Sequence, residues 1–171
     1  MEQATLKDTL ILNQSTGPLE KSMTLLLTDL VESTPEIDEV VQLDSRWIVS
    51  FNDAIDVMAE LDSSRDLLTL STDLGRPPAN RRGAVTELLL MYTSLMPTTQ
   101  STAMALTEPD GEFQQLRVLP VAQLDLAVLK SSLLDFTSLA RLWREVVAQG
   151  GEREGTTGRV ADMLANLSAR A

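Results

Sequence analysis

The feature that most constrains the fold is a strand-like run at residues 112–119 that meets Pro120 and is followed by a long amphipathic segment. Apolar side chains recur in that segment at helical spacing, and this stripe comprises Leu126, Leu129, Leu133, Phe136, Ala140, Trp143 and Val147. The period predicts one long helix that packs along a core and ends around Gln149, before Gly150-Gly151. Because Trp143 falls within the stripe, we expect it to be a core anchor and not an exposed binding residue.

Three runs with the two-residue period of half-buried strands lie further upstream. Their apolar positions are Trp47, Val49 and Phe51, then Ile55, Val57, Ala59 and Leu61, and then Leu68, Leu70 and Thr72. Asn52-Asp53 and residues 62–66 are good turn sequences, so the three runs predict an antiparallel meander. Residues 35–45 are acidic and are expected to be an irregular connection before it, with partial burial of Val40 and Val41.

A second group of strands is predicted near the middle of the chain. Residues 102–107 and 113–119 flank a turn sequence at residues 108–111, which is typical of a hairpin. Together with the meander, this hairpin predicts five antiparallel strands.

Two more helices complete the predicted order. The first begins at Gly17-Pro18 and carries one apolar face, made of Leu19, Met23, Leu26, Leu27 and Leu30. The second runs from Asn80 to about Met96 and is apolar on more than one face, so it must be covered twice, by this chain or by a second subunit. The order helix, three strands, helix, two strands, helix predicts an α+β fold with one antiparallel five-stranded sheet and three helices. We expect an N-terminal arm at residues 1–15, this domain at 16–149 and a flexible tail at 150–171.

Composition excludes several classes of site. The chain has no histidine and no cysteine, which removes histidine bases, thiolate nucleophiles and the usual zinc ligands. The glycines form no phosphate-binding loop. The formal net charge of -11 repels nucleic acid and anionic membrane surfaces. No segment reaches the roughly 18 apolar residues of a membrane span, and the N-terminus lacks a secretory signal, so stable membrane insertion is not expected and the expected location is the cytosol.

The carboxylates do not form a recognisable catalytic or metal site. Glu36, Asp38 and Glu39 lack the spacing of a calcium loop and are interpreted as a solvated acidic segment. Asp56 and Glu60 alternate along one strand and are interpreted as part of a solvated sheet face. We therefore predict no catalytic, cofactor-binding or metal-binding residues, and a protein that is not an enzyme.

The closing pattern resembles a known family. Residues 116–120, then Leu124-Asp125-Leu126, and then Phe136 to Trp143-Arg144 are similar to the last strand and C-terminal helix of the class I type III secretion chaperones, the Tir-chaperone family. Residues 68–74, followed by Gly75 and a proline-containing loop, resemble the family's third strand and the start of its second helix. The resemblance covers roughly residues 19–149.

The resemblance implies a two-fold homodimer that binds the extended N-terminal segment of a secreted effector in the cytosol and keeps it competent for secretion, without a cofactor. The effector would add a strand to the sheet edge and contact apolar grooves. The effector-binding residues that this implies, on the first helix and the first strands, are Leu27, Val31, Trp47, Val49 and Met58. Which of Trp47 and Ile48 faces outward stays open, and so does the alternative that all five candidates are core residues. The implied dimer-interface residues on the second helix are Leu88, Leu90, Met91 and Leu95.

Two alternatives stay open at this point. A dimeric regulatory adaptor would bind polypeptide in the same way, and sequence does not separate it from an effector chaperone. A small carboxylate-dependent enzyme would require a deep pocket with convergent polar groups, in contrast to shallow surface grooves.

Overall fold

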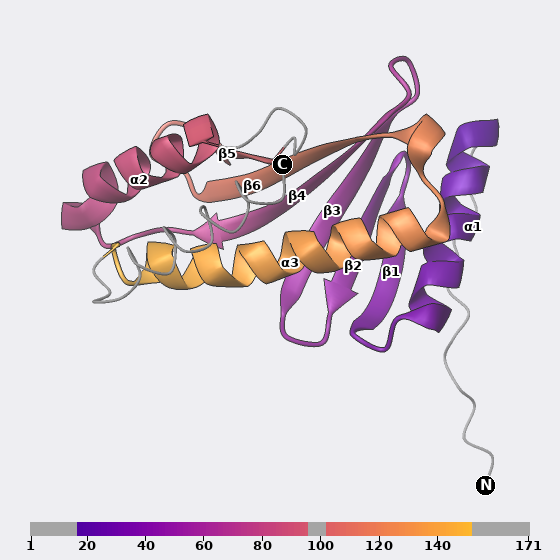
Figure 1. The fold of residues 1–171 in the computed structure, drawn as a ribbon, viewed down its shortest axis with the longest axis horizontal. Helices are drawn as coiled ribbons and strands as arrows, with labels where there is room; N and C mark the ends of the chain where they lie inside the picture. Colours follow the sequence, from indigo (N-terminus) through magenta and orange to yellow (C-terminus); the bar gives the residue numbers. More distant parts are fainter. Residues whose placement is uncertain (1–16, 96–101, 152–171) are drawn as a thin grey trace, which may run out of the picture.

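The computed structural model describes residues 17–95 and 102–151 (Figure 1). The predicted N-terminal arm at 1–15 and most of the predicted C-terminal tail lie outside the described residues. The three helices are α1 (Pro18–Ser33), α2 (Arg82–Leu95) and α3 (Leu126–Ala148), with short 3-10 helices at Ala79–Arg81 and Val121–Gln123. The strands are β1 (Ile37–Leu43), β2 (Arg46–Phe51), β3 (Ile55–Asp62), β4 (Leu67–Gly75), β5 (Thr102–Leu106) and β6 (Phe113–Pro120).

The α+β class and its three helices are confirmed, but the antiparallel sheet has six strands instead of the predicted five. Its order is β1-β2-β3-β4-β6-β5. The added strand is β1, which lies within the segment that was expected to be irregular. Val40 pairs with Val49 and Val41 with Ile48, while a bulge interrupts the register between Ile37 and Glu39. Carboxylates are tolerated on this strand because they face solvent at the edge of the sheet.

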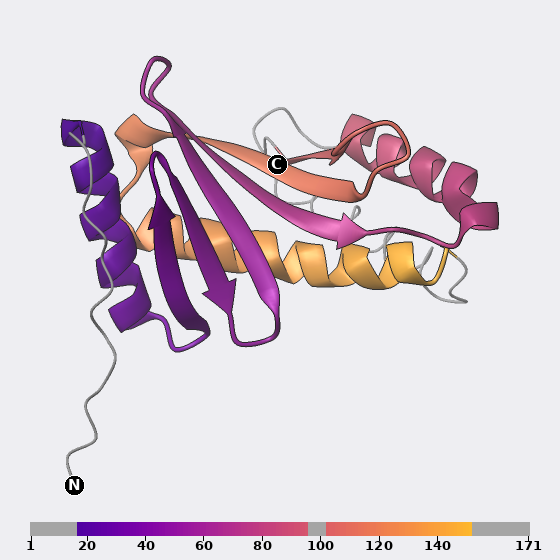
Figure 2. The same cartoon turned by 180° about the vertical axis from the view of Figure 1, so that it is seen from behind.

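Helices cover only one face of the sheet in the part of the chain that the structure describes. We call this the inner face, and the opposite one the open face. Figure 1 shows α3 passing in front of the strands, and Figure 2 shows the open face with α3 behind it. Trp47, Val49 and Val57 point inward and are fully buried, whereas Asp56, Met58 and Glu60 alternate with buried residues along β3 and are exposed.

Two hydrophobic cores lie on the inner face, and α3 contributes to both. In the first core, α1 and the first half of α3 pack against β1–β4, with Leu133 and Phe136 among the α3 residues. In the second, α2 packs against the second half of α3 and the ends of β4 and β6. Trp143 is 0% exposed at the centre of the second core, which confirms its predicted role as an anchor.

Polar groups define the position of α3 over the sheet. Asp125 caps its N-terminus, where the carboxylate accepts a hydrogen bond from the N–H of Val128 at 2.8 Å. Arg144 donates to the carbonyls of Asp73 at 2.7 Å and Ala54 at 3.1 Å, and so connects α3 to the end of β4 and to the β2–β3 turn. The helix ends at Ala148, close to the predicted end around Gln149, and is followed by Gly150, which has a φ of 64°.

Candidate binding surfaces

The two edge strands of the sheet differ in how accessible their backbones are. At β5, the N–H of Met104 donates to the hydroxyl of Thr93 at 3.2 Å, so α2 already occupies part of that edge. Within the described residues, β1 pairs only with β2. The helix α1 lies beside β1, where the hydroxyl of Thr24 is 3.1 Å from Oε1 of Gln42. This contact involves the side chain of Gln42 and not the backbone of β1, so the edge of β1 is the better candidate for pairing with another chain.

Exposed apolar side chains accompany the edge of β1 on the open face. Val41 is 41% exposed, Leu43 is 54% exposed, and Met58 on β3 is 39% exposed. A surface depression of about 300 Å³ lies between them and is lined by Leu43, Asp44, Ser45, Arg46, Ile48 and Met58. Its lining combines three apolar side chains with one carboxylate, one hydroxyl and one cation, and this mixed surface suits contact with polypeptide.

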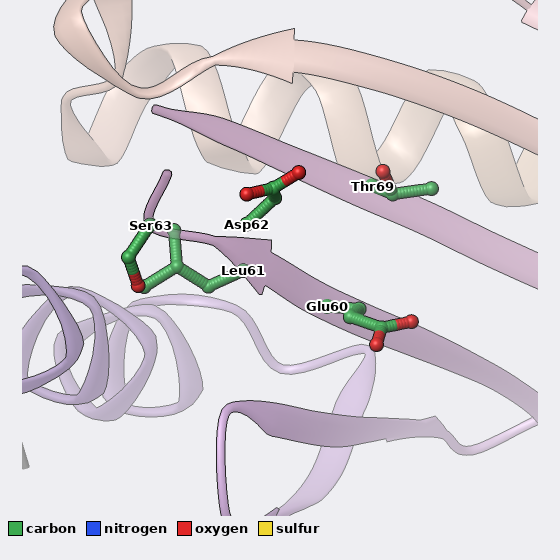
Figure 3. Close-up of a pocket in the computed structure, with 5 residues that line it drawn as sticks. All are labelled: Glu60, Leu61, Asp62, Ser63 and Thr69. Carbon is green, nitrogen blue, oxygen red and sulfur yellow. The ribbon is translucent and has the colours of Figure 1, made fainter. Parts of the chain in front are cut away.

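A second depression of about 430 Å³ lies at the end of the β3–β4 hairpin (Figure 3). It is lined by Glu60, Leu61, Asp62, Ser63 and Thr69. Glu60 is already paired, since its Oε1 lies 3.1 Å from Nε of Arg46. The hydroxyl of Ser64 donates to Asp62 at 2.6 Å and lowers the pKa of that carboxyl. The lowered pKa keeps Asp62 in its charged form, which does not favour a general acid at this position.

The strongest effects of burial on titration occur away from both depressions, in and beside the second core. Burial raises the pKa of Tyr92 to about 12, and it lowers the pKa of Arg117. Arg117 donates to the carbonyl of Ser132 at 3.0 Å and to the hydroxyl of Thr102 at 2.9 Å, so it connects β6 to α3 and β5. No cluster of three potential metal ligands is found among the described residues.

The residues predicted to bind effector do not form one surface. Leu27, Trp47 and Val49 are at most 1% exposed and belong to the first core, so the expectation that their side chains are available on the surface is wrong for this structure. Strand alternation shows that one face is buried, but does not show which face the helices cover. Val31 is half-buried at the margin of the first core, and Met58 is on the open face. An effector role for these two stays a prediction.

The predicted dimer residues also divide into two groups. Leu90 and Met91 on α2 are each 61% exposed. Leu88 is half-buried against the second core. Leu95 is the last residue of α2, and its side chain lies outside the described part of the structure. Leu90 and Met91 thus form an adjacent apolar pair on a helix that has its other face in the core.

Sequence reasoning missed Val41 and Leu43, because the acidic residues around them suggested a loop. The available signal was the alternation of Val41 and Leu43 with Gln42, next to the β-branched pair Val40-Val41. This short alternation marks a strand with one solvent-facing side.

Comparison with known proteins places this fold in a family. Residues 40–144 match the Tir chaperone protein (CesT) family, and the chain belongs to that family. It is therefore a type III secretion chaperone by class. No curated protein matches the sequence.

Two solved structures have similar folds. One is the HopA1-SchA chaperone-effector complex, with a TM-score of 0.60 and 18% identity over 77% of this chain and 99% of that chain. The other is the ExsC-ExsE complex, with a TM-score of 0.60 and 15% identity over 76% of this chain and 96% of that chain. Among the described residues, no helix is both long and apolar enough to cross a membrane.

Proposed function

We propose that this chain binds the extended N-terminal segment of a secreted effector in the cytosol and keeps it competent for secretion. The observation that carries the proposal is the edge of β1, which pairs only with β2 among the described residues and is bordered by Val41, Leu43 and Met58, in a chain of this family. An extended segment that pairs with β1 gains main-chain hydrogen bonds, and its side chains gain apolar contacts in the adjoining depression. Methionine adapts to different side chains, which suits contact with more than one sequence.

The same proposal includes a homodimer formed through α2. Leu90 and Met91 present an apolar pair to solvent, and a two-fold contact would bury it on both copies. The opposite face of α2 is occupied by the second core, so the pair is free to contact another subunit.

We also propose that the protein is not an enzyme and uses no cofactor. Its depressions contain ion-paired or hydrogen-bonded carboxylates, and the sequence has no histidine or cysteine. The net charge of -11 supports a polypeptide partner over nucleic acid.

The test is co-expression with each protein encoded beside the gene, followed by co-purification of intact and N-terminally truncated forms. We expect one such protein to co-purify only when its N-terminal segment is present. The double variant Val41→Lys/Leu43→Lys should abolish co-purification while its thermal stability stays close to that of the wild type. Val128→Lys is the matched control, because Val128 is 39% exposed on α3. Equal retention of the partner by the edge variant and the wild type would refute binding at β1.

A further inference from the structure

The open face carries one row of side chains that crosses all six strands. Each member pairs with the next through the sheet register, in the order Val41, Ile48, Met58, Ser71, Leu116 and Ala103. Ser71 is the only polar member of this cross-strand row. Val41 and Met58 are exposed and the other four are half-buried, although no described helix covers them. The five members other than Ser71 are apolar and in register, so the row forms an apolar strip with a single small polar residue within it.

The strip has different charges on its two sides. Residues two positions away along each strand form the flanks, since side chains alternate between faces. One flank contains Glu39, Asp56 and Asp73, together with Ser50, Gln114 and Ala105. None of these three carboxylates forms an ion pair within the described part of the chain. Arg144 reaches the main-chain carbonyl of Asp73 from the helix-covered side.

The opposite flank is close to neutral. It contains Leu43, Arg46, Glu60, Thr69 and Val118, and its only cation is paired with its only anion at 3.1 Å. The open face therefore has an apolar centre, one acidic border and one neutral border.

We propose that the open face binds an amphipathic helix of a partner polypeptide, with lysine or arginine along one side of its apolar stripe. Five strand spacings of about 4.8 Å make the row about 24 Å long. This length equals about 16 residues of α-helix at 1.5 Å per residue. The apolar stripe would lie on the row and the basic side would lie along Glu39, Asp56 and Asp73.

The fold itself shows that a helix can lie across these strands. On the inner face, α3 runs from the α1 side of the sheet to α2 and crosses the strands along its way (Figure 1). A basic partner is favoured over a second copy of this chain, because another copy would bring a further formal charge of -11 to an acidic border. The inference concerns the whole open face and goes beyond the proposed pairing of an effector with β1.

The probe is a fluorescent synthetic 18-residue helix with leucines at i, i+3, i+4 and i+7 spacing and lysines along one side. Binding to the full-length protein is measured by anisotropy. One control peptide has glutamate in place of lysine, and another keeps the lysines but scrambles the leucines, which separates docking from general attraction to an acidic protein. Methyl NMR locates the contact, with Ile48 and Met58 as reporters and Met23, which is 3% exposed in the first core, as the internal control.

Only the amphipathic lysine peptide should bind, and it should shift the Ile48 and Met58 methyl signals while leaving Met23 unchanged. Met58→Lys should weaken binding at least tenfold, whereas Val128→Lys should not. Neutralising the acidic border in the Glu39→Gln/Asp56→Asn variant should weaken binding about three- to tenfold at low salt, and Asp29→Asn on α1 should not.

Several results would overturn the proposal. These are equal binding of the scrambled or glutamate peptide, unchanged Ile48 and Met58 signals, or conversion of a dimer to a monomer by Met58→Lys without peptide. The last result would show that a second copy occupies the open face. Since no effector is present in this assay, its outcome does not depend on the proposed function.

Discussion

Replacing Leu90 and Met91 by glutamine should convert the proposed dimer to a monomer. Complete burial of a leucine or methionine side chain contributes about 1.5–3 kcal/mol. Each of these side chains is 61% exposed in the monomer, so burying this exposed part in the dimer contributes about 1–2 kcal/mol per side chain. The pair occurs twice in a two-fold contact, which gives about 4–8 kcal/mol for the dimer. Since 1.4 kcal/mol is a factor of ten, the double substitution should raise the dissociation constant at least about a thousandfold.

Glutamine is chosen because it is nearly as good a helix former as leucine or methionine, so α2 itself should be retained. Sedimentation equilibrium should give about twice 18.7 kDa for the wild type at micromolar concentration and 18.7 kDa for the variant. Leu25→Gln is the matched control, because Leu25 is 67% exposed on α1 and should leave the dimer intact. A double variant with the wild-type dissociation constant would refute the α2 interface, and a monomeric wild type would refute the dimer.

Three further predictions concern stability. Trp143→Ala should lower the free energy of unfolding by about 3–5 kcal/mol in urea titrations, because the indole is 0% exposed, and a loss below 1 kcal/mol would contradict its role as an anchor. Tyr92 is the only tyrosine, so its absorbance should report one ionisation. Its pKa is about 12 in the folded protein and 10 in the unfolded chain, so folding favours the neutral phenol. The contribution of neutral Tyr92 to the free energy of unfolding is therefore complete below pH 10 and is lost as the pH rises toward 12. Tyrosinate formation at pH 10 without unfolding would refute this prediction. Arg141 donates a hydrogen bond to Asp53 and lowers the pKa of that carboxyl below 3.8. Arg141→Gln should therefore lower the free energy of unfolding at pH 7, and this loss should diminish below pH 3.8. A loss that is constant with pH would exclude this pairing. The effect should be small, because the two side chains are 40% and 34% exposed.

The sequence predicted the helices and five strands well, because each has a clear period. In β3, for example, buried Val57 and Ala59 alternate with exposed Asp56 and Met58, and the turn at Asn52 is unambiguous. The edge strand β1 was missed because Ile37 is its only buried residue, so the acidic residues on it obscure the apolar alternation that identifies a strand.

The candidate surface was harder to predict than the fold, because it depends on how the elements are assembled. Alternation identifies Trp47 and Ile48 as opposite sides of β2, but only the packing of α1 and α3 shows that Trp47 faces the core. The row across the open face also requires β4 to pair with β6, which are separated in sequence by α2 and β5. Neither relation is encoded in a local period.

The participation of α3 in both cores has a consequence for how the protein opens. Phe136 packs in the first core and Ala140 in the second, so the two cores meet on successive turns of one helix. If either core opens, the part of α3 that it holds loses its packing. The adjoining turns of α3, which the other core needs in helical form, are then destabilised as well. The domain is thus expected to behave as one cooperative unit, in which the central amides of α3 exchange their hydrogens with solvent only when the whole domain unfolds.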